Sequence, residues 1–163
     1  MRRLVLSAMA VLVVATVALA GDLQKGIALY REAKYAEAEA ELRGVGGAEA
    51  SAYLAASLAK QKKYAEAEAP ARAALEPNPA YAVGAAALGE SLVGQSKFDE
   101  AITRLTTVIK EKSDVAYVYY WRAQAHHNKK EVARMVEDYQ SFLRLAPDAP
   151  EAAAVKILLA GLR

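Results

Sequence analysis

Two adjacent histidines are the side chains of this sequence that most readily bind metal ions or transfer protons. His126 and His127 are the only histidines among the 163 residues, and the chain has no cysteine. Neighbouring side chains on a helix point about 100° apart, so the two rings cannot bind one ion together. We therefore expect both rings to be solvated or to lie at the edge of a groove, and we predict no metal site.

Carboxylates are the next candidates, because paired Asp or Glu side chains can act as general acid and base. Glu37, Glu39 and Glu41 alternate with alanine, a spacing that distributes them around a helix instead of pairing them. We interpret them as a solvated helix face with lysine and arginine neighbours.

Phosphate-binding loops and nucleophilic serines are not indicated either. Gly84, Gly89 and Gly94 are evenly spaced in an alanine-rich segment, where close helix packing explains them better than a phosphate loop. The serines have no accompanying Asp–His arrangement that the spacing supports. The sequence predicts a protein without enzymatic activity or a cofactor, in which catalysis would need a partner to supply the active site.

A segment that returns along the chain shows how these residues are organised. Lys34–Ala40 recurs almost letter for letter as Lys63–Ala69, and a third, more divergent copy begins at Lys97. A period of about 20 to 50 residues indicates an array of one supersecondary unit. Such arrays usually build long surfaces that hold other proteins.

Helix-forming residues dominate from Asp22 onward, and no window shows the alternation of a strand. Glycine and proline clusters, such as Gly44–Gly47 and Pro77–Pro79, end the helices. Pro70 lies inside one helix, so we predict a bend there. The predicted all-α fold has helices near 22–33, 35–43, 49–61, 64–76, 81–95, 98–111, 115–128, 131–145 and 150–162.

This pattern resembles the tetratricopeptide repeat family, whose unit is a pair of antiparallel helices about 34 residues long. Its units have a small residue where the helices cross and an aromatic residue at the start of the second helix. The small residues here are Gly26, Ala55, Gly89 and Ala123, and the aromatic residues are Tyr35, Tyr64 and Phe98. The fourth unit departs from the pattern, because Val132 and Met135 stand where an aromatic and a small residue are expected.

The resemblance implies a right-handed α-solenoid over residues 21–163. Its four units lie near 21–47, 48–81, 82–115 and 116–149, and residues 150–163 form a C-terminal capping helix. We expect the apolar side of this helix to cover the last pair and its charged residues to face water. The apolar residues are Val155, Ile157, Leu158, Leu159 and Leu162, and the charged ones are Glu151, Lys156 and Arg163.

The first twenty residues have the order of a secretory signal peptide. Arg2 and Arg3 supply a charged start, an apolar run follows, and Ala18-Leu19-Ala20 indicates cleavage after Ala20. An uncleaved membrane anchor is the alternative, although the apolar run is short for a bilayer-spanning helix. The remaining chain has 19 basic and 19 acidic residues, which indicates neither nucleic-acid nor anionic-membrane binding. We expect a periplasmic or cell-envelope protein without stable membrane insertion after cleavage.

The first helix of each pair lines the concave side in tetratricopeptide proteins, and this side binds peptides. Carrying those positions over gives candidate peptide-binding residues that combine aromatic rings with a few charged or amide groups. They are Tyr30, Arg31, Tyr53, Lys60, Glu90, Tyr117, Tyr120, Trp121, Gln124, His127 and Asn128. We expect the chief contacts from Tyr53, Tyr117, Tyr120 and Trp121. Consecutive aromatic residues point all round a helix, so Trp121 belongs either to the groove or to the core.

The sequence thus predicts a non-enzymatic interaction module, an adaptor or assembly factor. It would bind an extended or helical segment of another protein on its concave face. The alternative is a structural protein that forms homo-oligomers through the ends of its solenoid.

Overall fold

The computed structural model describes residues 22–162, and all regular structure in that range is helical. The nine helices are α2 (Leu23–Arg31), α3 (Tyr35–Leu42), α4 (Ala48–Lys60), α5 (Tyr64–Leu75), α6 (Ala82–Gly94), α7 (Phe98–Glu111), α8 (Ala116–Asn128), α9 (Val132–Leu145) and α10 (Ala152–Ala160). These bounds lie close to those of the predicted helices, so the all-α prediction is confirmed. The predicted signal peptide lies outside the described residues. No helix within 22–162 has both the length and the apolar character needed to cross a bilayer.

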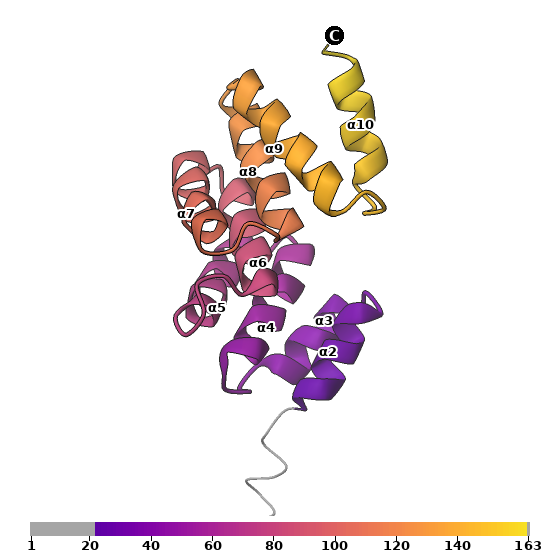
Figure 1. The fold of residues 1–163 in the computed structure, drawn as a ribbon. Coiled ribbons are helices and arrows are strands. Elements are labelled where there is room, and N and C mark those ends of the chain that lie inside the picture. The colour runs from indigo at the N-terminus through magenta and orange to yellow at the C-terminus, as the bar shows by residue number, and fades with distance from the viewer. Residues whose placement is uncertain (1–21, 163) are drawn as a thin grey trace, which may run out of the picture.

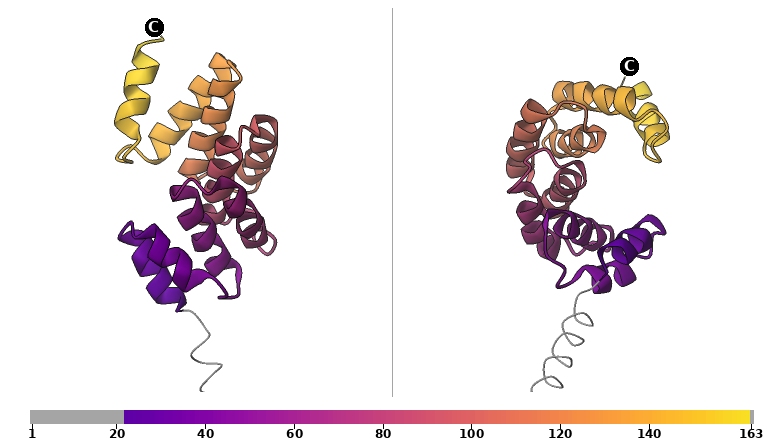
Figure 2. Two further views of the ribbon diagram at one scale, coloured as in Figure 1. Left: turned by 180° about the vertical axis from the view of Figure 1, so that it is seen from behind. Right: turned by 60° about the horizontal axis from the view of Figure 1, so that its bottom comes forward.

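Consecutive helices pair and stack into a curved solenoid. The pairs are α2 with α3, α4 with α5, α6 with α7, and α8 with α9 (Figure 1). Viewed from its lower end the solenoid forms an open arc, with α2 near one end and α10 at the other (Figure 2). Each pair contacts the next, so the apolar faces form one continuous core.

Small residues allow the helices to approach closely where they cross. A Cβ atom added to Gly26 would lie 2.6 Å from Cγ of Leu42 on the partner helix. A Cβ atom added to Gly89 would lie 2.8 Å from Cβ of Trp121 and 3.2 Å from the Leu105 side chain. Gly89 therefore sets the spacing both within its own pair and toward the next one.

The first helix of each of the four pairs ends in the same left-handed corner. The corner residues are Ala33, Lys62, Ser96 and Lys130, with φ between 59° and 62°. The residue after each corner donates its N–H to a carbonyl in the last turn of the helix, as in Lys34 to Leu29 at 2.9 Å. Left-handed backbone costs a residue with a Cβ about 1–2 kcal/mol, so these corners persist because the packing of the two helices outweighs that cost.

A buried carboxylate connects the first pair to the second, a contact that we call the first joint. Glu39 of α3 is 7% exposed and accepts hydrogen bonds from Lys63 and Gln61, each at 2.8 Å. Arg43 also donates to it, at 2.5 Å. Burial alone would raise the pKa of Glu39, but the three donors outweigh it and lower the pKa to about 2. The predicted solvated face is therefore wrong for Glu39, although Glu37 is exposed as expected.

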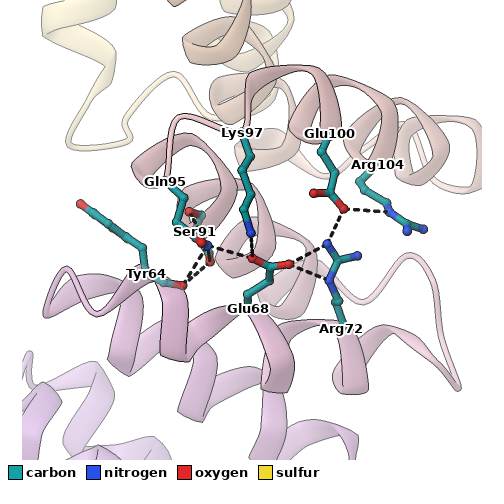
Figure 3. Close-up of polar contacts among 8 residues, drawn as sticks. All are labelled: Tyr64, Glu68, Arg72, Ser91, Gln95, Lys97, Glu100 and Arg104. Carbon is teal, nitrogen blue, oxygen red and sulfur yellow. Dashed lines mark hydrogen bonds and ion pairs between the residues drawn. The ribbon is translucent and has the colours of Figure 1, made fainter.

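The second joint, between the second and third pairs, repeats this arrangement (Figure 3). Glu68 of α5 accepts hydrogen bonds from Lys97 at 2.7 Å, Arg72 at 2.8 Å and Gln95 at 2.9 Å. The bond from Lys97 is the largest cause that lowers the pKa of Glu68, to about 2. Arg72 also donates to Glu100 at 2.5 Å, so its guanidinium bridges α5 and α7.

Two buried serines differ in what they bind. Ser91 Oγ donates across the second joint to the carbonyl of Tyr64, at 2.6 Å. Ser57 is its counterpart in the preceding repeat, but its Oγ donates to the Tyr53 carbonyl of its own helix, at 2.7 Å. Of these two serines, only Ser91 therefore connects two pairs.

The third joint, between the third and fourth pairs, uses other residues. Arg122 of α8 donates two hydrogen bonds to Asp138 of α9, at 2.7 and 2.8 Å, and one to Thr106 of α7, at 2.9 Å. His126 packs beside this group, 4% exposed, with Nδ1 2.6 Å from a Glu131 carboxylate oxygen. The expectation of a solvated or groove-edge ring is wrong for His126, because its side of α8 faces α9.

Two further predictions concern single helices. α5 runs through Pro70 as one helix, and the bend expected there stays a prediction. The capping role is only partly correct for α10: Ala152 and Val155 are buried, but Ile157 is 75% exposed and Leu162 is 48% exposed. α10 contacts α9 alone among the described helices, so its other side is left uncovered.

Candidate binding groove

The concave side holds a groove with a volume of about 700 Å³. It is lined mainly by the first helices of the four pairs and by the two residues that directly precede α10. Its floor consists of small apolar side chains, which are Ala56, Ala82, Val83, Ala86 and Ala87. Small residues at these positions leave room for a ligand where larger ones would fill the space.

A tyrosine cluster forms the wall near the N-terminus. The ring centroid of Tyr30 lies 5.6 Å from that of Tyr35 and 5.4 Å from that of Tyr53. These tilted and edge-to-face contacts hold the rings in fixed positions. Burial raises the pKa of Tyr30, so its phenol is neutral and can donate a hydrogen bond.

A second aromatic group forms the opposite wall. Tyr117 and Trp121 line the groove, and Tyr120 lies behind them, with its ring centroid 5.0 Å from that of Trp121. Tyr120 in turn packs on Phe142 and Tyr139 of α9, at 5.1 and 6.0 Å between centroids. The wall is thus supported from behind by the core of the fourth pair.

The charged groups in the middle of the groove are paired. Lys60 Nζ lies 2.8 Å from a carboxylate oxygen of Glu90, an ion pair that connects α4 to α6 across the middle of the groove. Burial alone would lower the pKa of Lys60, but the hydrogen bond and charge of Glu90 raise it, so the ammonium form is retained. Tyr117 donates its hydroxyl to Glu151 at 2.7 Å, and burial together with this bond raises the pKa of Tyr117.

The family comparison agrees with this geometry. Residues 86–156 match the family model described as the tetratricopeptide repeat. This part of the chain therefore carries the tetratricopeptide repeat. The matched range includes most of α6, all of α7, α8 and α9, and the first half of α10. No curated protein matches the sequence significantly.

Solved structures with the same tetratricopeptide solenoid come from several bacteria. TTC0263, a thermophilic TPR protein of Thermus thermophilus, has a TM-score of 0.72 and 18% identity, over 84% of this chain and 80% of its own. MamA of Desulfovibrio magneticus RS-1 has a TM-score of 0.61 and 17% identity, over 86% and 88% of the two chains. A MamA structure designated MSR-1 has a TM-score of 0.61 and 19% identity, over 84% of each chain. At these identities the likeness establishes the fold.

Most of the predicted binding residues lie on this groove of the tetratricopeptide solenoid. Those that line it are Tyr30, Arg31, Tyr53, Lys60, Glu90, Tyr117 and Trp121. Trp121 also packs against the core of the third joint, so the two alternatives considered for it both hold. Whether these residues bind a peptide stays a prediction.

The other four predicted residues do not line the groove. Tyr120 packs into the core behind the wall, and Gln124 donates to its hydroxyl at 3.1 Å. His127 is exposed, with Nδ1 3.0 Å from the sulfur of Met135, and Asn128 donates to the Gln124 carbonyl at 2.9 Å. Gln124, His127 and Asn128 lie in the C-terminal half of α8, beyond the residues of that helix that line the groove.

Several residues that line the groove were not among the predicted binding residues. They include Tyr35, Lys112, Asp114, Pro150 and Glu151. Tyr35 begins a second helix, and the other four lie in connecting segments, whereas the prediction used only first-helix positions. The proline cluster before α10 marks a turn but does not specify that the chain returns toward α8.

Proposed function

We propose that this protein is a non-enzymatic interaction module that binds a peptide or protein segment in its concave groove, as an adaptor or assembly factor. The observation that supports this function is the groove of about 700 Å³ with an apolar floor and two rigid aromatic walls. Rigid rings provide a large contact area at a low entropic cost, and paired charges on the rim orient a polar backbone. Pockets that bind ligands commonly have about this volume.

The groove favours a mainly apolar segment over one of strong net charge. Lys60 is already neutralised by Glu90, and Glu151 accepts from Tyr117. A strongly acidic or basic ligand would have to compete with these contacts, whereas apolar side chains fit the alanine floor directly.

Site-specific photo-crosslinking tests the groove. A photoreactive residue at Ala86, on the groove floor, should capture one defined segment in cells, and mass spectrometry then identifies it. The control is the same residue at Ala65, an exposed position on the second-helix side of the solenoid. Equal capture at both positions would contradict the proposal.

Calorimetry with the captured segment completes the test. Tyr53→Ala should weaken its binding by about tenfold or more, because a central aromatic contact typically contributes at least about 1.4 kcal/mol. Trp121 is the only tryptophan, so its fluorescence should change when the segment binds. Unchanged affinity in Tyr53→Ala would place the segment elsewhere.

Residues 1–20 alone support an export signal and a periplasmic or cell-envelope location. The N-terminal sequence of the protein isolated from cells tests this location. A mature chain that begins at Gly21 in the envelope fraction is expected. A chain that retains residues 1–20 and sediments with membranes would favour the anchored alternative.

Self-association through the ends of the solenoid is the second candidate function. The specific observation in its favour is the uncovered apolar side of α10, where Ile157 is 75% exposed.

A further inference from the structure

α10 carries an exposed apolar stripe on the side that faces away from α9. Ala153, Ile157 and Ala160 are all exposed, and their spacing of four and three positions places them on one helix face. The opposite face, with Ala152 and Val155, is buried against α9. Ile157 is the one large apolar side chain of this stripe, so the surface gains weight as an interaction site from its place in the repeat and from the apolar area beside it.

The repeat register gives the stripe a defined role. Ile157 stands one repeat length after Ala123, the small buried residue at the crossing of α8 and α9. The stripe is therefore the face on which the second helix of a pair lies in the preceding units. Within residues 22–162 no helix covers it, so α10 is a first helix whose partner position is open.

We propose that α10 of a second copy of this chain fills this position, with the two α10 helices antiparallel about a two-fold axis near Ile157. The two helices of each pair within the solenoid already run antiparallel, so such a dimer continues the packing that the chain uses throughout. The stripe is also self-complementary. An axis near Ile157 places Ala153 opposite Ala160 of the second copy and leaves the two isoleucines at the centre.

The single charge within α10 is compatible with a second copy. Lys156 borders the stripe, three positions after Ala153, and its Nζ lies 3.5 Å from the carbonyl of Pro147, which precedes the helix. Each lysine therefore extends toward the N-terminal end of its own α10, so the two ammonium groups point away from each other in an antiparallel pair.

A neighbouring hollow enlarges the apolar surface. It lies between α9 and α10 and has a volume of about 440 Å³. Its lining combines apolar side chains with Gln140 and Lys156; the apolar ones are Val136, Leu143, Leu159, Ala160 and Leu162. In Figure 1 the two helices diverge toward the C-terminus, in agreement with this opening. A stable dimer buries more surface than one helix stripe provides, and this hollow supplies additional apolar area.

Sedimentation equilibrium of the full chain tests the dimer. The wild-type chain should show a monomer–dimer equilibrium, and Ile157→Glu should weaken it by about a hundredfold, because it places two carboxylates at the axis. Ala65→Glu introduces the same charge at an exposed position of α5 and should leave the equilibrium unchanged. Circular dichroism should report unchanged helicity for Ile157→Glu, since the side chain is 75% exposed.

A single cysteine tests the axis directly, because the natural chain contains none. Ile157→Cys should form a disulfide-linked dimer under mild oxidation, whereas Ala65→Cys on the second-helix side of the solenoid should not. Equal cross-linking of both variants, or a monomeric wild-type chain at all concentrations, would overturn the proposal. If the wild-type chain is monomeric but floats with lipid vesicles and Ile157→Glu does not, the stripe binds membrane instead.

This inference develops the self-association candidate and does not depend on groove binding. Tyr53→Ala should therefore dimerise normally, and Ile157→Glu should retain the affinity of the groove for its segment. A wild-type chain that binds its segment but does not dimerise contradicts the dimer alone, and one that dimerises but binds no segment contradicts the groove proposal alone.

Discussion

Glu39 and Glu68 connect the first three helix pairs through a buried and a partly buried carboxylate, whereas Ile102 occupies the equivalent position in the third joint. There an Arg122–Asp138 pair within the fourth unit reaches α7 only through Thr106, Lys129 pairs with Asp99 of α7, and mainly aliphatic packing that includes Trp121 completes the joint. Hydrogen bonds in the first two joints specify how the pairs are oriented. Packing in the third joint supports the aromatic wall of the groove, so this joint combines stability with the binding surface.

The largest effect is expected from breaking the ion pair of the third joint. Asp138→Ala should lower the free energy of unfolding by about 3–5 kcal/mol, because it leaves the guanidinium of Arg122 buried without its partner. Chemical denaturation measures this change. The double variant Arg122→Met with Asp138→Leu should recover most of the loss. A double variant as unstable as Asp138→Ala would mean that the cost does not arise from an unpaired charge.

Removing the charge of the carboxylate in the second joint should lower the stability less than Asp138→Ala does. Glu68→Gln should lower the free energy of unfolding by about 2–3 kcal/mol at neutral pH, because the amide cannot accept the charge-assisted bonds of Lys97 and Arg72 equally well. Glu66→Gln is the matched control, since Glu66 is exposed and forms its ion pair with Arg43 at 3.2 Å. It should change stability by less than about 0.5 kcal/mol. Equal effects would show that burial does not distinguish the two.

The same carboxylates should make stability depend on pH. Their pKa values are about 2 in the folded chain, below the ordinary 4.5, so their contribution is complete above about pH 4.5 and is lost as the pH falls toward 2. Each should contribute about 2 kcal/mol to this loss. Urea unfolding from pH 6 to pH 2 of the Glu39→Gln, Glu68→Gln double variant should show a correspondingly flatter profile. A profile as steep as that of the wild type would exclude both groups as the cause.

The smallest difference is expected between the two buried serines. Ser91→Ala should cost about 1 kcal/mol, because it removes a bond across the second joint and leaves Gln95 as the only side chain bonded to the Tyr64 carbonyl. Ser57→Ala should cost less than about 0.5 kcal/mol, since the Tyr53 carbonyl is already bonded within its helix. Thermal melting of both variants measures the contrast. A larger loss in Ser57→Ala would reverse the assignment.

The helices and their pairing follow from the sequence because local signals specify them. Alanine-rich segments alternate with glycine and proline breaks, and the recurring Lys-Tyr-Ala-Glu segment fixes the register. The aromatic groove residues on first helices also follow, since these helices line the concave side, whereas Tyr35 at the start of a second helix does not. Tyr53 and Trp121 were found in this way.

Burial that depends on distant segments could not be predicted from local pattern. Glu39 is buried because Gln61 and Lys63 approach it from the following helix pair. Tyr120 and Trp121 are adjacent and equally aromatic, so only the position of α9 decides which one lies in the core. Ile157 was assigned to the cap because its apolar character is clear from the sequence, but the direction in which it points is not.

The left-handed corners have a consequence for how such a chain can change in length. Since Ala33, Lys62, Ser96 and Lys130 adopt nearly one backbone conformation, a whole hairpin can be duplicated or exchanged without redesigning the corner. Adding complete helix pairs lengthens the concave side of the solenoid and leaves its two end helices unchanged. Evolution could thus adjust the size of the guest that fits inside independently of what the last helix binds.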